Sequence, residues 1–148
     1  MEFRAAVSAD IPALCELLRE LFAQEAEFVP NRETQERGLN AIMENPDVGR
    51  ILVAAANGKV VGMVSVLYTV STALGSRVAL LEDMVVSSDA RGLGIGSELL
   101  EYAVASASAA GCSRITLLTD QENMAAQRFY KRQGFVSSSM IPLRLVVK

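Results

Sequence analysis

The sequence predicts an α/β protein in which a mixed, mostly antiparallel sheet carries helices on both faces. One observation is the Asn57-Gly58 pair, which separates two apolar runs rich in β-branched residues and is typical of a β-hairpin. The other is a helical pattern over residues 97–110, which connects the apolar runs 77–86 and 113–119. Because a helical crossover joins parallel strands, these two runs are expected to pair in parallel.

Length and composition indicate a single domain over residues 1–148. Hydrophobic residues make up 51% of the chain and charged residues 21%, which suffices for one buried core. The net charge is −3 and no basic run occurs, so we expect no nucleic acid partner. The chain has no histidine, the commonest metal ligand, and we expect no metal site.

Cysteine placement and the lack of a spanning segment favour a cytoplasmic protein without a membrane partner. Cys15 and Cys112 lie far apart, show no metal-ligand spacing, and are expected to be buried thiols. A chain without a disulfide framework fits a reducing compartment. The N-terminus lacks an apolar signal core, and Asn57-Gly58 divides the apolar stretch 51–70 into pieces too short to cross a bilayer.

The first part of the chain predicts a strand, two helices and the hairpin. Ser8 is expected to cap the first helix, and Pro12 fits its first turn, where a missing N–H costs little. Asn45-Pro46-Asp47 ends the second helix. The predicted bounds are 3–7 for the first strand, 14–22 for the apolar stripe of the first helix, 24–31 for a polar connection, 32–43 for the second helix, and 50–56 and 59–70 for the hairpin strands.

The second part predicts two helices that alternate with strands. The helix over 97–110 ends at Gly111 and is followed by the parallel strand 113–119. A last helix, capped by Asn123, is expected to reach residue 133, and one or two final strands follow over 135–147, with Pro142 at an edge or a bulge. The residues of the 97–110 helix that are expected to face the core are Leu99, Leu100, Ala103, Val104 and Ala107.

A glycine-rich turn over residues 91–97 has the features of an anion site. Gly92, Gly94 and Gly96 can adopt positive φ and have no Cβ to exclude a ligand. The helix that follows begins with N–H groups that lack intrahelical partners, and its dipole favours phosphate there. Arg91 adds a cation. The alternative interpretation is a glycine-rich turn without a ligand.

The spacing of this turn argues against two common nucleotide motifs. A phosphate-binding loop of the Walker A type needs Gly-Lys-Ser/Thr, but Gly96 is followed by Ser97-Glu98. A dinucleotide fingerprint places its third glycine where this chain has Ser97. It also starts directly after its strand, whereas four polar residues separate Val86 from Arg91 here.

A second motif, which runs from Asn123 to Phe135, completes a family resemblance. Arg91-x-x-Gly94-x-Gly96 followed by Asn123-x-x-Ala126-x-x-Phe129-Tyr130-x-x-x-Gly134-Phe135 resembles the GNAT superfamily of N-acetyltransferases. The resemblance covers the second half of the chain closely and implies the GNAT acyl-CoA N-acyltransferase fold. It also implies that two central parallel strands separate, so that the pantetheine arm of acetyl-CoA enters between them like an added strand.

The resemblance implies a set of residues for acetyl-CoA. The diphosphate would lie on the turn, the main chain after Asp83 would hold the pantetheine and polarise the thioester carbonyl, Asn123 would contact the pantetheine, and Ala126 would leave room for it. The cofactor-binding residues expected on this basis are Met84, Val85, Val86, Arg91, Gly92, Leu93, Gly94, Ile95, Gly96, Ser97, Asn123, Ala126 and Tyr130.

Glu82 is the candidate catalytic base. It lies in an otherwise apolar strand, two residues before the segment expected to polarise the carbonyl, and family members often place an acid on this strand. A carboxylate with an ordinary pKa is too weak to deprotonate an alkylammonium directly, so it needs a water relay or a raised pKa. The alternatives are a carboxylate paired with an arginine and a substrate clamp. Asp83 is expected on the opposite face of the strand and is the lesser candidate.

Tyr130 is the candidate acid. It follows Asn123 by seven residues, so both side chains project from one face of a helix. Its phenol can donate a proton to the departing thiolate of CoA. The alternative is a tyrosine whose ring packs in the core while its hydroxyl stays hydrated. Phe129 is expected in the core.

The sequence therefore predicts an acetyl-CoA-dependent N-acetyltransferase that acts on a primary amine of a small molecule or a protein, by direct attack in a ternary complex. The alternatives are a non-catalytic acyl-CoA-binding regulatory module and, less consistent with the glycine spacing, a dinucleotide-binding domain. A homodimer through the final strands is plausible. Glu25, Glu27 and Glu33 could attract a cationic amine, although a solvated acidic loop is the favoured interpretation.

Overall fold

The computed structural model describes residues 1–23 and 31–147. Its contacts divide the chain into two compact units, a larger unit Met1–Leu118 and a smaller unit Thr119–Lys148. Most of the polar connection expected over 24–31, with Glu25 and Glu27, lies outside the described residues.

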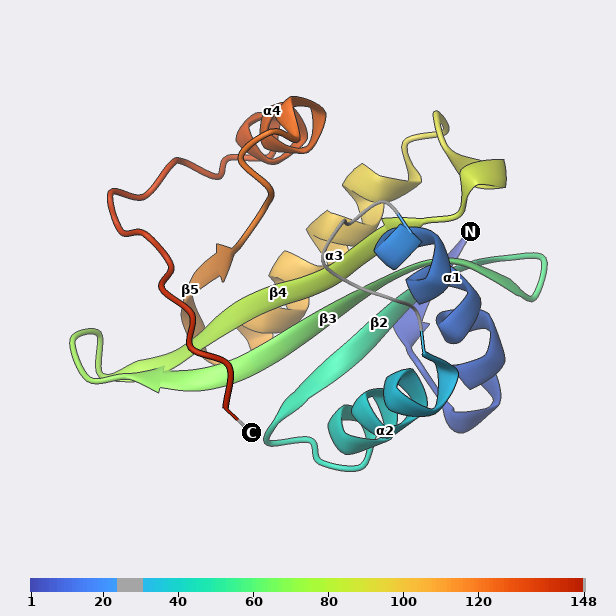
Figure 1. Ribbon diagram of the computed structural model, residues 1–148, viewed down its shortest axis with the longest axis horizontal. Coiled ribbons are helices and arrows are strands. Elements are labelled where there is room, and N and C mark those ends of the chain that lie inside the picture. The colour runs from blue at the N-terminus through green and yellow to red at the C-terminus, as the bar shows by residue number, and fades with distance from the viewer. Residues whose placement is uncertain (24–30, 148) are drawn as a thin grey trace. The chain divides into compact units, whose positions relative to one another are not determined.

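The larger unit is built on a five-stranded sheet of order β1-β2-β3-β4-β5 (Figure 1). Strands β1 to β4 pair antiparallel with their neighbours, whereas β5 pairs parallel with β4, as the helical crossover predicted. The mixed, mostly antiparallel sheet is therefore confirmed. The strands are β1 Glu2–Ala5, β2 Gly49–Ala56, β3 Lys59–Ser71, β4 Ser76–Val86 and β5 Cys112–Leu117.

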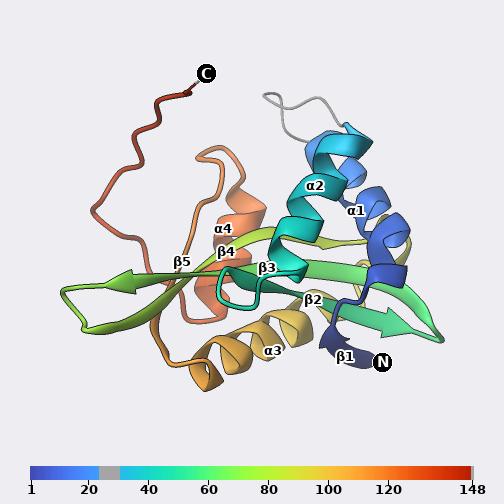
Figure 2. The same ribbon diagram turned by 90° about the horizontal axis from the view of Figure 1, so that it is seen from below.

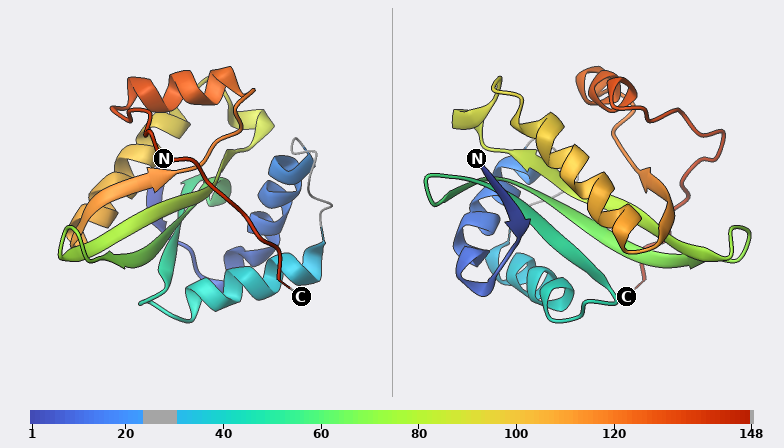
Figure 3. Two further views of the ribbon diagram at one scale, coloured as in Figure 1. Left: turned by 60° about the vertical axis from the view of Figure 1, so that its left-hand side comes forward. Right: turned by 180° about the vertical axis from the view of Figure 1, so that it is seen from behind.

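Helices cover both faces of this sheet. Helices α1 (Ile11–Ala23) and α2 (Arg32–Met43) lie on one face, and α3 (Ile95–Ala109) crosses the other (Figures 2 and 3). The core on the first face joins Leu14, Leu17 and Leu18 of α1 to side chains of β2, β3 and β4. On the second face α3 buries Leu99, Leu100, Ala103 and Ala107, as predicted. Val104 is 38% exposed, so its expected place in the core was wrong.

Local turn chemistry accounts for the hairpin between β2 and β3. Asn57 has φ 52° and Gly58 has φ 79°, so both residues occupy the left-handed region. A two-residue hairpin turn with positive φ at both positions matches the right-handed twist of its strands, and Asn-Gly is the pair that adopts it most readily. The predicted hairpin is confirmed.

The two cysteines differ in burial. Cys15 is 2% exposed within the core of the larger unit, as predicted. Cys112 is only half-buried at the start of β5, so its expected full burial was wrong.

The smaller unit contains α4 (Met124–Arg132). The side-chain oxygen of Asn123 accepts a hydrogen bond from the Ala126 N–H at 3.0 Å, which confirms Asn123 as the cap. The final strand expected over 135–147 is not observed, because no described residue of this segment pairs with a strand. Its apolar side chains are exposed; examples are Val136, Ile141 and Leu143. Alternating apolar residues show that a segment can be a strand, but only a partner makes it one.

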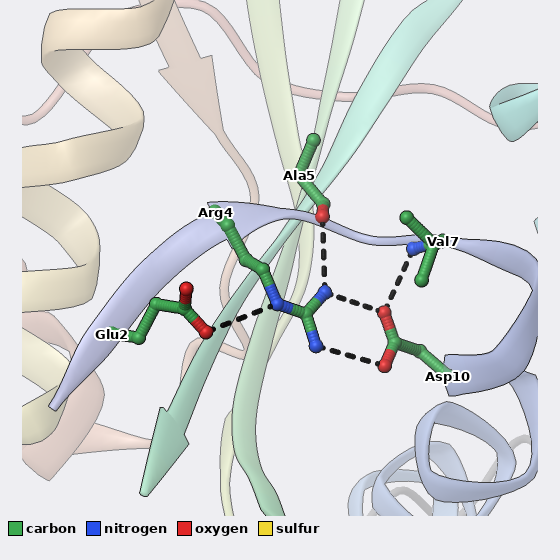
Figure 4. Close-up of polar contacts among 5 residues, drawn as sticks. All are labelled: Glu2, Arg4, Ala5, Val7 and Asp10. Atoms are coloured by element: carbon green, nitrogen blue, oxygen red, sulfur yellow. Dashed lines mark hydrogen bonds and ion pairs between the residues drawn. The ribbon is translucent and has the colours of Figure 1, made fainter. Parts of the chain in front are cut away.

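The entry to α1 depends on Asp10 instead of Ser8. Ser8 begins a short 3₁₀ turn, Ser8–Asp10, and makes no side-chain cap there. The Asp10 carboxylate accepts from the Val7 N–H at 2.7 Å and from both terminal nitrogens of Arg4, at 2.7 and 3.1 Å (Figure 4). Asp10 is 8% exposed, so this cluster joins β1 to α1 beneath the surface. The expectation that Ser8 caps the helix was wrong because a carboxylate with two partners satisfies more donors than a hydroxyl can.

We predict that Asp10→Asn destabilises the fold in a pH-dependent way. The hydrogen bonds from Arg4 lower the pKa of Asp10 below its ordinary value of 3.8, although burial opposes them. A carboxyl with a lowered folded-state pKa stabilises the protein above its unfolded-state pKa and loses this contribution as the pH falls through the folded value. Urea unfolding should show a loss of about 2 kcal/mol at pH 7, the scale of a charged hydrogen bond, and a smaller loss near pH 3.

Asp47→Asn is the matched control for this prediction. The Asp47 side chain is fully exposed and lies 3.8 Å from Arg77, so its removal should leave the unfolding midpoint unchanged. An equal effect of Asp10→Asn at pH 7 and pH 3 would contradict the role given to its charge.

Candidate functional site

The parallel pairing between β4 and β5 ends before β4 does. The last paired residues are Leu81 of β4 and Leu117 of β5, and β5 ends at Leu117. Strand β4 continues to Val86 and keeps its antiparallel pairing with β3 on the other side. Beyond Leu81, no described strand of the larger unit pairs with the second edge of β4. The family resemblance implied that the parallel strands separate near this point, and a strand edge without a paired neighbour can offer main-chain donors and acceptors to a ligand.

A β-bulge lies where this open segment begins. Ser65 of β3 pairs with Glu82 and Met63 pairs with Val85, so one β3 residue faces Asp83 and Met84 together. Asp83 adopts φ 54°, a left-handed conformation that is uncommon outside glycine, asparagine and aspartate. Bulges of this kind redirect side chains next to functional sites.

The bulge changes where Asp83 points. The hydroxyl of Ser65, which is fully buried, lies 3.3 Å from the Asp83 carboxylate and donates to it. Ser65 is also the cross-strand partner of Glu82, so both acidic residues adjoin Ser65. The expectation that Asp83 alternates to the opposite face was wrong, because a bulge interrupts the period of two. The sequence did not lead us to Ser65 as a site residue, although a lone serine between Val64 and Val66 in an apolar strand is a signal of such a residue.

The open segment, residues 82–86 of β4, is anchored in the core by a side chain, while its main chain lies at the edge of the strand. Val85 is 6% exposed and packs in the core beneath α1 and α2, whereas Met84 and Val86 are half-buried. Glu82 is exposed at the start of the segment. An exposed carboxylate there can reach both water and a bound ligand.

The glycine turn follows β4 after the short 3₁₀ turn Ser88–Ala90. The Arg91 guanidinium donates from Nε to the carbonyl of Val86 at 3.2 Å, which ties the turn to the end of the strand. Gly92 and Gly94 have φ 82° and 78°, and Gly94 is the N-cap of α3. Helix α3 begins at Ile95, so Gly96 and Ser97 lie in its first turn. The expected helix start at Ser97 was therefore wrong by two residues, and only Gly92 and Gly94 use the freedom of glycine.

The turn presents main-chain donors to an open surface. The first intrahelical bond at this end joins the Glu98 N–H to the Gly94 carbonyl at 3.2 Å. Helix geometry gives the N–H groups of Ile95 and Gly96 no acceptor within α3. A Cβ placed on Gly92 or Gly94 would meet no atom within 4 Å, so the main chain can be approached closely. Donors at a helix N-terminus suit an anion such as a diphosphate.

The smaller unit carries the remaining predicted residues on α4. Asn123, Ala126 and Tyr130 follow at helical spacing, so they share one side of the helix. The Tyr130 ring contacts Phe129 and Phe135 edge-on, with centroids 5.1 and 5.8 Å apart. Burial raises the pKa of the Tyr130 phenol, which keeps it protonated at neutral pH. Phe129 is half-buried.

The predicted site residues thus form two sets, one in each unit. Glu82, the segment 84–86 and the turn 91–97 belong to the larger unit, and the α4 residues belong to the smaller one. Among the described residues, no group of three or more histidine, cysteine, aspartate or glutamate side chains could hold a metal ion. None of the described helices is long and apolar enough to cross a membrane.

Known proteins resemble this chain over nearly its whole length. The model of the acetyltransferase (GNAT) family matches residues 11–135. The aminoalkylphosphonate N-acetyltransferase of Salmonella typhimurium is 31% identical over 137 residues, which cover 93% of this chain and 86% of that protein. A solved structure from Bacillus halodurans C-125, described as a transcriptional regulator, is 29% identical with a TM-score of 0.85 and 99% coverage of both chains.

A further solved structure shares the fold at lower identity. A protein from Clostridium acetobutylicum, described as a predicted acetyltransferase and solved with acetyl-CoA, has a TM-score of 0.79 and 20% identity, and the match covers 97% of this chain and 95% of that one. The family match spans both motifs quoted above, the glycine turn and the Asn123–Phe135 motif. The chain therefore belongs to the acetyltransferase (GNAT) family, and its enzyme class is N-acetyltransferase.

Proposed function

We propose that this N-acetyltransferase uses acetyl-CoA and transfers the acetyl group to a primary amine by direct attack in a ternary complex. The observation that carries the proposal is the open edge of β4 beyond Leu81, which the short segment 87–90 connects to the glycine turn of the same unit. An unpaired strand edge can bind the pantetheine, and a diphosphate site next along the chain can bind the phosphate end of the same arm. The acetyl-CoA in the Clostridium acetobutylicum neighbour supports this choice of cosubstrate.

The turn would hold the diphosphate of acetyl-CoA. Gly92 and Gly94 allow close approach, and the N–H groups of Ile95 and Gly96 point out of the start of α3 as donors. Arg91 would add positive charge beside them. Leu93 and Ser97 belong to the same segment and complete the proposed contact surface.

The open edge of β4 would hold the pantetheine. Its two amides can pair with the main chain of Met84, Val85 and Val86 as another strand would. One N–H of this segment would polarise the thioester carbonyl and stabilise the oxyanion of the tetrahedral intermediate. Because the Val85 side chain is buried in the core, the main chain at this point is held before the ligand arrives.

Proton transfers complete the reaction. The amine nitrogen attacks the thioester carbon, the C–S bond breaks, and the CoA thiolate takes a proton from Tyr130. The proton that the acylated nitrogen then loses returns the tyrosinate to its phenol form. The amine must first lose a proton, which costs about 4–5 kcal/mol at pH 7 for an alkylammonium of ordinary pKa. The exposed Glu82 would accept this proton through water, since its carboxylate is a weak base. The family resemblance also assigns Asn123 and Ala126 of the smaller unit to the pantetheine.

The acceptor is proposed to be a small molecule with a primary amine, and a protein amino group is the alternative. The Salmonella relative is named for aminoalkylphosphonates, so this class leads the set to be tested. A thiol-release assay with acetyl-CoA over aminoalkylphosphonates, other amines and peptides should show turnover with at least one acceptor. Binding of acetyl-CoA without turnover on any acceptor would instead favour the regulatory module.

We predict that Tyr130→Phe lowers kcat by about 10²-fold or more, because the thiolate leaves without its proton donor. The Kd for acetyl-CoA should stay within about twofold, since the ring remains; isothermal titration and steady-state kinetics measure the two quantities. Tyr102→Phe is the matched control, because Tyr102 packs against Phe3 in the larger unit, and it should leave kcat unchanged. A Tyr130→Phe variant with full turnover would rule out the acid role.

We predict that Gly94→Ala weakens acetyl-CoA binding by about tenfold or more. Its φ of 78° costs an alanine about 1–2 kcal/mol, and the new methyl group would occupy the space proposed for the diphosphate. Gly75→Ala is the matched control, since Gly75 has φ 64° and equally open surroundings in the turn between β3 and β4. Both variants should lose similar stability in urea, but only Gly94→Ala should raise the Kd. Equal affinity in the two variants would refute the diphosphate site.

A further inference from the structure

We infer that Glu20 of α1 is a positioning residue for the glycine turn, an inference that rests on the proposed function. One carboxylate oxygen of Glu20 accepts from the Ser88 hydroxyl at 2.8 Å and from the Ser88 N–H at 3.3 Å. Glu20 and Ser88 are 68 residues apart in the chain, so this contact joins α1 to the segment between β4 and the turn.

The contact supplies a cap that the segment itself lacks. Ser88–Ala90 forms a short 3₁₀ turn, and the residue before it, Ser87, makes no side-chain cap hydrogen bond. The first N–H of such a turn has no partner within it and favours an acceptor, best a charged one. Glu20 therefore performs from α1 the capping that a local side chain performs in most helices.

This cap lies at Ser88, seven residues before Ile95, the first of the proposed diphosphate donors. On its strand side, the Ser87 N–H is fixed to the Val61 carbonyl at 2.7 Å, and on its other side Arg91 is fixed to Val86. Gly92 and Gly94 follow Arg91, and their main chain is more flexible than that of other residues. Donors that are held in place bind a ligand more tightly than donors that must first be ordered, so we expect the cap to lower the Kd for acetyl-CoA.

Glu20 contributes little to the packing of α1. It is half-buried, while the packing of this helix is carried by Leu14, Leu17 and Leu18, which belong to the core. Glu16, one turn earlier on the same helix, is exposed and pairs only locally, with Arg19 at 3.1 Å. Glu16 therefore offers a control with the same residue type on the same helix but without a link to the turn.

The test compares acetyl-CoA binding and kinetics in Glu20→Ala, Ser88→Ala and the double variant. Glu20→Ala removes both hydrogen bonds and should raise the Kd and KM for acetyl-CoA about fivefold or more, with kcat within about twofold. Ser88→Ala keeps the N–H donor and should have a smaller effect. The double variant should match Glu20→Ala, since residues that act through one contact are not additive. Glu16→Ala should behave like the unaltered protein.

Glu20→Gln separates geometry from charge, because an amide keeps the oxygen acceptor but loses the charge. Its KM should stay within about twofold of the unaltered protein, and a loss as large as that of Glu20→Ala would overturn a positioning role. An unchanged KM in Glu20→Ala, or in Ser88→Ala if Glu20→Ala does not fold, would also overturn it. If the unaltered protein does not bind acetyl-CoA, the proposed function fails first, which distinguishes the two failures.

Discussion

Among the described strands, only β3 pairs with the end of β4, and this constraint organises the site. The ladder to β5 ends at Leu81 and Leu117, while β3 stays paired with β4 as far as Val86. Main-chain N–H and C=O groups that no neighbouring strand pairs cost free energy unless water or a ligand forms hydrogen bonds with them. Water can do so in the unliganded protein, and a pantetheine with two amides can replace it. In this account, the part of β4 that β5 leaves unpaired becomes the binding surface for the pantetheine.

The elements around this edge hold it in one conformation before any ligand arrives. Val85 anchors the segment in the core, the Ser65 hydroxyl contacts the Asp83 carboxylate at the bulge, and Arg91 fixes the start of the turn. Asp83 adopts a left-handed conformation that costs free energy in an isolated chain. Its buried neighbours offset this cost. The result is a set of donors whose ordering entropy is lost during folding and not during binding.

The sequence predicted those features that depend on local chemistry. Asn57-Gly58 fixed the hairpin, the crossover through α3 fixed the parallel pair, and Asn123 caps α4 as expected. Features that depend on partners far away in the chain were not predicted. Nothing near Asp83 indicates a bulge, since its cause lies in the pairing with β3, and Asp10 replaced Ser8 because of Arg4 on another element. The apolar residues over 135–147 indicated strands, but strands also need partners, which composition does not specify.

The most direct test of the central claim is a crystal structure of the protein with acetyl-CoA. The account predicts that the pantetheine amides hydrogen-bond to the main chain of residues 84–86 and that the diphosphate lies on the N–H groups of Ile95 and Gly96. The thioester should then lie beside the bulge, within reach of Glu82. Acetyl-CoA bound elsewhere, with the edge of β4 still hydrated and the turn empty, would contradict the account.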